Sequence, residues 1–234
     1  WKDKIESGRT VTDFVSFPDI APTLLDIVGV PIIDQMTGKS FKEQLLSDQS
    51  GRIEFERNYT LLGKERHDIG RVEGDKLSVS YPVRAIRTDQ YLYIKNFIPS
   101  RWPAGNPEYG LLNCDNSPTK SHLISLKGDQ KMGNYYQMSF GKRPEEELYN
   151  IIEDPDCFVN LADNINYSKI KDSLWLSLKT KLVEQKDPKI LGKGEIFDFY
   201  PYSRIPRQQK LYNDPNYDPI KIFEDKYNQK INVN

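Results

Sequence analysis

The sequence changes its pattern within Arg143-Pro-Glu-Glu-Glu-Leu-Tyr-Asn-Ile-Ile-Glu-Asp-Pro-Asp-Cys-Phe-Val-Asn-Leu-Ala162. Leu148 and Ile151 are apolar residues set among charges, as in a strand with one buried face. Pro155 can continue neither a strand ladder nor a helix interior, so the strand must end at the turn before it. Asn160 lies where this turn gives way to a new periodic run. The stretch predicts a strand, a tight turn and the approach to a helix.

Three further strands are predicted ahead of this one. Apolar and aromatic residues alternate at period two in three pairs, Tyr59 and Leu61, Val83 and Ala85, and Tyr91 and Tyr93. Arg87-Thr-Asp-Gln90 supplies the turn of a hairpin. We therefore expect strands near residues 57–62, 82–88, 91–96 and 146–150. Four strands linked by hairpins imply a small antiparallel sheet.

A long amphipathic helix is predicted after the sheet. Its apolar face consists of Tyr167, Ile170, Leu174, Leu178 and Leu182, with lysines and a glutamate off the stripe. The helix would cover one face of the sheet, and each buried leucine would contribute roughly 1.5–3 kcal/mol of transfer free energy. A sheet of about four strands packed against one long helix is an α+β fold.

The first 50 residues predict helices without a complete core. One helical face carries Phe17, Ile20, Ala21, Leu24, Leu25 and Val28. Ser16 and Asp19 suit a capping box, and Pro22 requires that the helix start after Ser16 or kink. Ser40-Phe-Lys-Glu43 is a second capping box, ahead of a short helix. Residues 1–15 are too short to cover the apolar face, so we expect its partner upstream of Trp1.

Two stretches lack sustained periodicity. We expect a long loop at about 98–145, with one helical turn after Ser117-Pro118; a loop of this length is usually functional or mobile. Residues 187–234 are rich in Tyr, Pro, Asp and Asn, and only Ile220–Tyr227 suggests a helix. We expect this segment to be an irregular tail that wraps an existing surface. The predicted division is therefore 1–50, 51–186 and 187–234.

Composition excludes several classes of protein. The 234 residues contain 33 Lys+Arg and 34 Asp+Glu, so no global field recruits nucleic acid or an anionic membrane. No apolar run approaches the roughly 18 residues that a membrane span needs. Cys114 and Cys157 are too few for a disulfide framework and have no metal-ligating neighbour at close spacing. We expect neither a nucleic-acid nor a membrane partner.

Two motifs, in this order along the chain, resemble the sulfatase family. The stretch from Ser16 to Val30 is similar to the segment that closes the large N-terminal domain of sulfatases, and Gly38-Lys-Ser-Phe41 to the step that follows it. Glu147-Leu-Tyr-Asn150, the Asp154-Pro155 turn and Asn160-Leu-Ala162 resemble the C-terminal subdomain. Three segments between these motifs resemble the sulfamidase-like branch of the family. They are Leu62–Asp68, Tyr81–Arg87 and Tyr91–Asn96. The resemblance covers residues 1 to about 200.

The resemblance implies the C-terminal portion of a sulfatase of the alkaline-phosphatase-like superfamily. Such an enzyme hydrolyses sulfate esters or sulfamates, here of a sulfated glycan. On this interpretation, residues 1–50 end an α/β catalytic domain that this chain does not contain. Residues 51–186 form the subdomain that lines one wall of the substrate cleft. The implied partners are the N-terminal catalytic domain of the same protein and the glycan, in the periplasm, the lysosome or outside the cell.

The nucleophile motif of this family does not occur in the sequence. Sulfatases use a formylglycine hydrate beside a divalent metal, usually calcium, and make it from the Cys or Ser of Cys/Ser-x-Pro-x-Arg. Neither cysteine has that context, and Ser16-Phe-Pro18 has Ile20 in place of the arginine. Asp115-Asn116 lies on the wrong side of the first motif to match the family's metal ligands, and a turn explains it. We expect no catalytic residue and no metal ligand here, calcium and formylglycine only in the full-length enzyme, and no activity for this chain alone.

Lys64, Arg66 and His67 are the candidate substrate-binding residues. They lie just after a predicted strand, where a loop projects polar side chains, and two cations with an imidazole suit sulfate or sugar hydroxyls. The matching histidine of the sulfamidase-like branch lies at the mouth of the cleft, which favours His67. A solvated charged turn is the alternative.

Other polar residues are open to two interpretations. Arg84 and Arg87 would pair with acidic neighbours on the exposed face of a strand. Arg101-Trp102-Pro103 would offer a sugar-stacking surface, or Trp102 would anchor the loop as a buried aromatic. His122 is expected on a helix surface. A non-enzymatic module that binds sulfated or acidic sugars is the rival function, and the sequence upstream of Trp1 would discriminate between the two.

Overall fold

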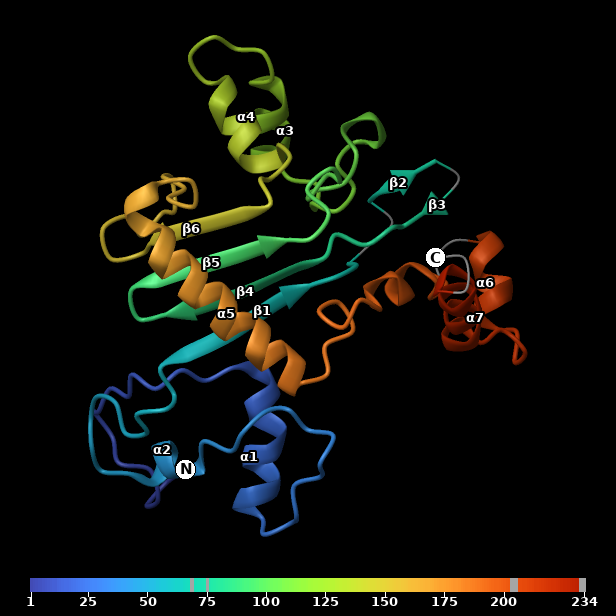
Figure 1. Ribbon diagram of the computed structural model, residues 1–234. Coiled ribbons are helices and arrows are strands. Elements are labelled where there is room, and N and C mark those ends of the chain that lie inside the picture. Colours follow the sequence, from blue (N-terminus) through green and yellow to red (C-terminus); the bar gives the residue numbers. More distant parts are fainter. Residues whose placement is uncertain (68–69, 75, 203–205, 232–234) are drawn as a thin grey trace. The chain divides into compact units, whose positions relative to one another are not determined.

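A four-stranded antiparallel sheet with the strand order β1-β4-β5-β6 organises the fold (Figure 1). The computed structural model describes residues 1–67, 70–74, 76–202 and 206–231. The four strands are β1 Tyr59–Lys64, β4 Val83–Thr88, β5 Tyr91–Asn96 and β6 Glu146–Asn150. Backbone hydrogen bonds flank the β5–β6 pair, from Asn96 N to Glu145 O at 2.8 Å and from Ile151 N to Gln90 O at 2.9 Å. All four predicted strands are confirmed within two residues.

The predicted helix is confirmed as α5, Ser168–Glu184, which crosses one face of the sheet (Figure 1). The rings of Tyr93 on β5 and Trp175 on α5 are 6.3 Å apart, and Leu178 and Leu182 are buried. A short 3-10 helix, η3 Ile165–Tyr167, precedes α5. Residues of the predicted apolar stripe are therefore buried, as their spacing predicts.

The turn before α5 is held by side-chain hydrogen bonds. Asp154 Oδ2 accepts from Val159 N at 2.8 Å, which closes the turn at Pro155. Asn160 Oδ1 accepts from Leu148 N at 2.9 Å and from Ala162 N at 3.0 Å. Asn160 thus pins the outgoing chain against β6, because one carbonyl oxygen serves both segments.

The chain divides into two compact units, and the boundary passes through the sheet and α5. Unit 1 comprises Trp1–Leu62, Ala85–Tyr93 and Leu148–Leu178; unit 2 comprises Gly63–Arg84, Ile94–Glu147 and Lys179–Asn234. Each unit is described by itself below.

Unit 1 begins with the predicted helix, divided in two parts. These are η1 Phe17–Asp19 and α1 Ile20–Ile27, so Pro22 falls in the first turn of α1, where it costs no helical hydrogen bond. Asp19 accepts from Ser16 N at 3.1 Å, as the capping prediction requires. Its carboxylate also pairs with buried Arg57 at 3.2 Å and accepts from Lys39 N at 2.8 Å. Asp19 thereby anchors the start of α1.

The predicted apolar face of α1 is exposed within this chain. Phe17 is 89% exposed, Leu24 59% and Val28 69%, and further exposed apolar residues near it in the sequence are Ile20, Val30, Ile32 and Ile33. The buried residues of α1 are Pro22 and Thr23 instead. Nothing in the described part of the chain covers this face, in agreement with the expectation that its partner lies elsewhere.

The second short helix, α2 Lys42–Leu46, is present, but the capping box predicted for it is wrong. Phe41 is the N-cap and makes no side-chain cap bond. Ser40 Oγ donates to Asp26 Oδ2 at 2.6 Å and accepts from Lys42 N at 3.2 Å. Ser40 is therefore drawn toward α1, because Asp26 offers its hydroxyl a charged acceptor.

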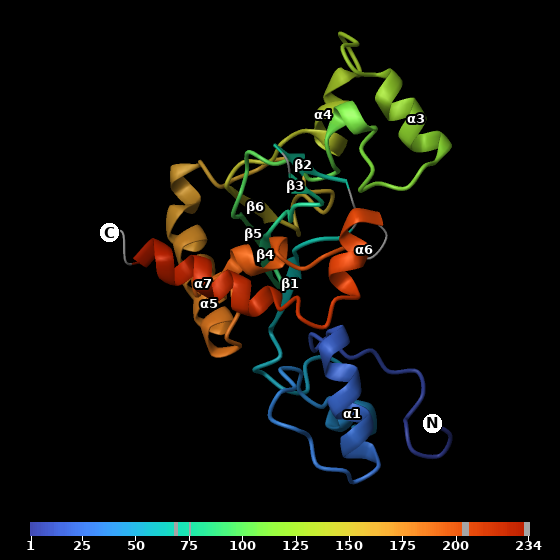
Figure 2. The ribbon, with the colours of Figure 1, turned by 90° about the vertical axis from the view of Figure 1, so that its right-hand side faces the viewer.

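Unit 2 contains more regular structure than its sequence predicts. The hairpin of β2 Val72–Glu73 and β3 Lys76–Leu77 was not predicted. The expected long loop at 98–145 contains η2 Pro107–Tyr109, α3 Pro118–Ser125 and α4 Gly133–Phe140, with α3 beside α4 (Figure 2). Leu111, Tyr136 and Phe140 form a buried cluster there. The description of this segment as a loop is wrong, since it has a small core of its own.

The expected irregular tail also forms helices. They are η4 Gly194–Asp198, α6 Pro206–Tyr212 and α7 Pro219–Ile231, of which the sequence suggested only part of α7. Phe223 of α7 is buried, and its ring lies 5.9 Å from that of Phe199. Asp198 accepts from Ser80 N at 2.7 Å, so the tail contacts the segment ahead of β4 within unit 2.

Candidate substrate-binding site at the end of strand β1

The three predicted substrate-binding residues lie where β1 ends. Lys64 is the last residue of β1, and Arg66 and His67 follow it. Arg66 is half-buried and donates from Nη1 to Tyr200 O at 2.7 Å, while His67 is exposed. Asp68, which completes the sequence motif, lies outside the described residues. The role of this trio in substrate binding stays a prediction.

Arg84 holds the backbone from which this motif projects. Its guanidinium is buried and forms ion pairs with Glu65 at 2.6 Å and Asp187 at 2.8 Å. Arg84 Nη1 also donates to Lys64 O at 3.3 Å. Gly63 leaves room for this side chain, because a Cβ there would lie 3.1 Å from Arg84 Cδ. The prediction that Arg84 pairs with acidic groups is right, but its placement on an exposed face is wrong.

Arg87, the companion of Arg84 on β4, behaves differently. It is exposed, and its guanidinium carbon lies 5.5 Å from the centre of the Phe14 ring. The predicted pairing of Arg87 with an acidic neighbour is not found among the described residues. Arg84 and Arg87 are three residues apart on β4, so their side chains lie on opposite faces of the strand. The carboxylates that meet Arg84 come from the segment after β1 and from the tail.

The cations near the end of β1 carry an electrostatic cost. Burial lowers the pKa of Lys64, and the charge of Arg71 lowers it further. Burial likewise lowers the pKa of Arg66. A lowered pKa means that the environment disfavours the positive charge, and a bound anion would offset that cost.

Arg71 is a buried cation held by neutral acceptors. It donates to the backbone carbonyls of Trp102 at 2.8 Å, Pro103 at 3.1 Å and Val79 at 3.3 Å, and also to Asn113 Oδ1. Burial lowers its pKa to about 10. No ion pair to a carboxylate is found for it within the described ranges. Arg71 ties the chain before β2 to the segment after β5.

Trp102 serves partly as the anchor that the sequence suggested as an alternative. It is half-buried, its carbonyl accepts from Arg71, and Lys142 Nζ lies 5.0 Å above its ring. A lysine already occupies one face of the ring, so at most the other face is left for a sugar. Sequence reasoning missed Arg71 because its partners are backbone carbonyls, which leave no signal in the sequence.

Groups for metal or acid-base chemistry are sparse. Over residues 1–67, 70–74, 76–202 and 206–231, no three His, Cys, Asp or Glu side chains gather as metal ligands would. Asn116 Oδ1 accepts from Lys120 Nζ at 3.2 Å, and Cys114 and Cys157 are not joined by a disulfide. His122 lies exposed on α3, as predicted. None of the described helices has the length and apolarity needed to span a membrane.

Comparisons with known proteins give consistent results. No family model matches the chain. Two ulvan-active sulfatases from Formosa agariphila are 29% identical over 93% of this chain and 28% identical over 84% of it, covering 32% and 34% of their own lengths. A solved Bacteroides thetaiotaomicron structure, described with the metabolism of multiple glycosaminoglycans, matches 82% of this chain and 31% of its own, with TM-score 0.50 and 19% identity. That last likeness supports the fold alone. The chain spans about a third of the length of the curated relatives it matches.

Proposed function

We propose that this chain, which belongs with the sulfatases and spans about a third of the length of the curated relatives it matches, is the C-terminal part of a sulfatase acting on a sulfated glycan. In that enzyme it lines one wall of the substrate cleft, and the nucleophile, formylglycine and calcium belong to the N-terminal catalytic domain. The observation that carries the proposal is the sequence match over 93% of this chain to an ulvan-active sulfatase. The glycan is accordingly a sulfated polysaccharide of the ulvan type, met in the periplasm or outside the cell.

The exposed face of α1 supports the partnership with a catalytic domain. Phe17 of η1, Leu24 of α1 and the C-cap residue Val28 lie exposed, whereas the polar residue Asp19 of η1 is buried and paired. Burying a side chain of this size gains roughly 1.5–3 kcal/mol, so leaving several in water is costly. The catalytic domain of the same protein is the occupant that we assign to this face, because the family resemblance of Ser16–Val30 is to the end of that domain.

The cations at the end of β1 support the contact with substrate. Lys64 and Arg66 have lowered pKa values because they are partly buried, and His67 is exposed beside them. A sulfate group accepts hydrogen bonds from all three side-chain types and neutralises the two cations. We assign the three residues to the sulfated substrate, with His67 nearest the mouth of the cleft.

The rival function is a module that binds sulfated glycan without hydrolysing it. The lack of a nucleophile signature in this sequence is what favours it. The coding sequence immediately upstream of Trp1 separates the two possibilities. A Cys/Ser-x-Pro-x-Arg signature with Asp and Asn ligands there supports the enzyme, whereas a stop codon or an unrelated domain supports the module.

A chimera tests the proposal directly. The matching third of the Formosa agariphila ulvan-active sulfatase is replaced by this chain, and sulfate release from ulvan oligosaccharides is measured with and without a calcium chelator. We expect calcium-dependent release by the chimera and none by this chain alone. Chelator-sensitive hydrolysis of an aryl sulfate by the 234-residue chain alone would overturn the assignment of the chemistry to another domain.

His67 offers the sharpest test of the substrate contacts, because the chain holds only one other histidine. In the chimera, His67→Ala should lower kcat/KM for ulvan oligosaccharides by about tenfold, the loss of one charge-assisted hydrogen bond. The matched control is His122→Ala, which removes an exposed histidine from α3. Equal kcat/KM values for the two variants would refute the role of His67.

A further inference from the structure

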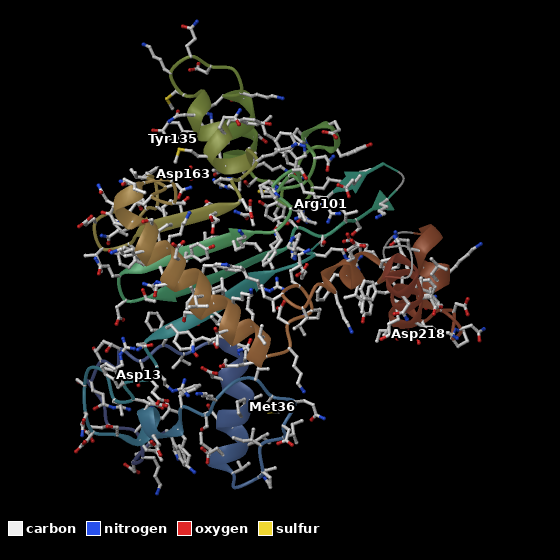
Figure 3. The ribbon with its side chains drawn as sticks, viewed as in Figure 1. Asp13, Met36, Arg101, Tyr135, Asp163 and Asp218 are labelled. Atoms are coloured by element: carbon white, nitrogen blue, oxygen red, sulfur yellow. The ribbon has the colours of Figure 1, made fainter. Side chains whose placement is uncertain are left out.

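A cavity of about 300 Å³ lies within unit 2, and its lining includes none of the predicted trio at the end of β1. Its lining comes from the β2–β3 hairpin, the segment after β5 and the tail. The lining includes Lys76, Arg101, Lys189, Gly194, Phe199 and Lys226. Figure 3 labels Arg101, which lies in the segment after β5 near the hairpin. Ligand pockets begin at about this volume, which accommodates one sugar unit.

The floor of the cavity is a rigid polar network around Arg101. Its Nη2 pairs with Glu73 at 2.7 Å and Asp198 at 3.2 Å, and its Nη1 donates to Ser80 O at 2.9 Å and Ser80 Oγ at 3.0 Å. Asp198 Oδ1 in turn accepts from Ser80 N at 2.7 Å. Arg101 Nε is buried and forms no hydrogen bond with the described residues. Two of the three lining carboxylates are thus paired with Arg101, whose single charge offsets one of them.

The remaining lining charge is positive. Lys76, Lys189 and Lys226 face a single further carboxylate, that of Glu195. No ion pair is found for the three lysines in the part of the chain that the structure describes. Burial lowers the pKa of Lys189, and the negative charges of Glu65 and Asp198 oppose that shift only in part. The four cations of the lining, Arg101 included, therefore outnumber its three carboxylates by one.

Aromatic rings and a glycine set the position of two of these lysines. Lys226 Nζ lies 5.1 Å from the centre of the Phe199 ring, and Lys189 Nζ lies 5.6 Å from that of Phe97. A Cβ at Gly194 would lie 2.2 Å from Lys189 Cδ and 3.0 Å from its Cα. Gly194 therefore lets the Lys189 side chain lie across the backbone of η4. Because Phe199 also lines the cavity, it presents an apolar surface beside the ammonium groups.

We propose that this cavity binds an anionic sugar unit, with its carboxylate or sulfate on Lys189, Lys226 and Lys76 and its apolar ring face on Phe199. Cations with one aromatic surface are the chemistry that holds a charged sugar, since the ring C–H groups pack on the aromatic and the anion meets the lysines. Only the source of that sugar, a glycan chain that extends beyond the reacting sulfate, rests on the proposed function.

The test uses the 234-residue chain itself, without catalysis. Chemical-shift titrations with glucuronate, glucose 6-sulfate and neutral glucose report binding at the cavity. We expect millimolar binding of at least one anionic sugar, weaker binding at higher salt, and no binding of glucose. Saturation by glucuronate alone identifies a uronate site, by the sulfate ester alone a sulfated-sugar site, and by both a general anion site. Equal shifts with glucose and with both anions would overturn the proposal.

Variants distinguish binding in the cavity from unspecific attraction to positive charge. Lys189→Met and Lys226→Met should each weaken binding by about tenfold, the loss of one charge-assisted contact. The matched control Lys179→Met removes an exposed lysine of α5 that does not line the cavity, and should change nothing. Gly194→Ala keeps every charge but displaces Lys189, so it should also weaken binding about tenfold. If Lys189→Met, Lys226→Met and Gly194→Ala all bind as the unaltered chain does, the site is elsewhere.

This experiment and the chimera fail independently. A chimera without sulfatase activity, together with anion binding by this chain, would refute the proposed function and leave the cavity assignment standing. An active chimera with no sugar bound at the cavity would refute the cavity assignment and leave the proposed function standing.

Discussion

Replacing Arg84 by methionine should destabilise this chain far more than replacing Arg87 on the same strand. The guanidinium is buried between Glu65 and Asp187, at 2.6 Å and 2.8 Å, and each carboxylate side chain is at most 15% exposed. Removing the cation leaves two buried carboxylates facing each other without compensation. Breaking a buried ion pair in this way costs about 3–5 kcal/mol. We expect that loss in the free energy of unfolding measured by urea denaturation.

A matched control lies on the same strand. Arg87→Met removes an exposed arginine whose contact is the ring of Phe14, worth about 0.5–1 kcal/mol. If the two variants lose the same free energy, Arg84 is not the buried anchor that we describe. Adding Glu65→Gln and Asp187→Asn to Arg84→Met should restore about 1–3 kcal/mol, because neutral amides cost less to bury than unpaired carboxylates.

The pH dependence of the Arg84 variant has a definite sign. Burial raises the pKa of Glu65 above 4.5, and the charge of Arg84 opposes that rise. A carboxyl whose folded pKa exceeds its unfolded value stabilises the fold below the unfolded pKa, and this contribution is lost as pH rises through the folded pKa. Without Arg84 the pKa rises further. The deficit of Arg84→Met relative to the unaltered chain should therefore be smaller below pH 4.5 than at neutral pH, and a deficit independent of pH would contradict this.

Three further predictions follow from particular contacts. Leu24→Ser should change the free energy of unfolding of this chain by less than about 0.5 kcal/mol, since the Leu24 side chain is exposed. The same change should weaken binding of a separately produced catalytic domain about tenfold. Unchanged binding would exclude this face as the interface. Arg71→Met should cost about 3 kcal/mol in urea denaturation because it leaves buried carbonyls unpaired, and a loss below about 1 kcal/mol would refute that role. Gly38→Ala should cost about 2 kcal/mol, because its Cβ would lie 2.0 Å from the backbone oxygen of Pro18. A thermal melt unchanged from that of the unaltered chain would show that the backbone yields there.

The sheet and α5 were predictable because each buries one face continuously. Alternation at period two located the strands, and the spacing of Leu174, Leu178 and Leu182 located the helix. The hairpin of β2 and β3 was not predictable, since strands of two residues each are too short to show a period. Helix α4 could not be predicted for a related reason, because only Tyr136 and Phe140 of its eight residues are buried.

Candidate site residues could be identified from the sequence only where they cluster along the chain. Lys64, Arg66 and His67 were found because they cluster along the chain. Arg84 was identified as an ion-pairing residue, but its burial depends on Asp187, which is far away in the sequence. The cavity around Arg101 depends on Asp198 and on the tail, whose packing no periodicity indicates.

The central claim is that this chain supplies the supporting part of a sulfatase and that another domain supplies the chemistry. Calcium-dependent sulfate release from ulvan oligosaccharides, compared between the chimera and this chain alone, tests it most directly. We expect release by the chimera and none by the chain. An inactive but folded chimera, or an active isolated chain, would contradict it.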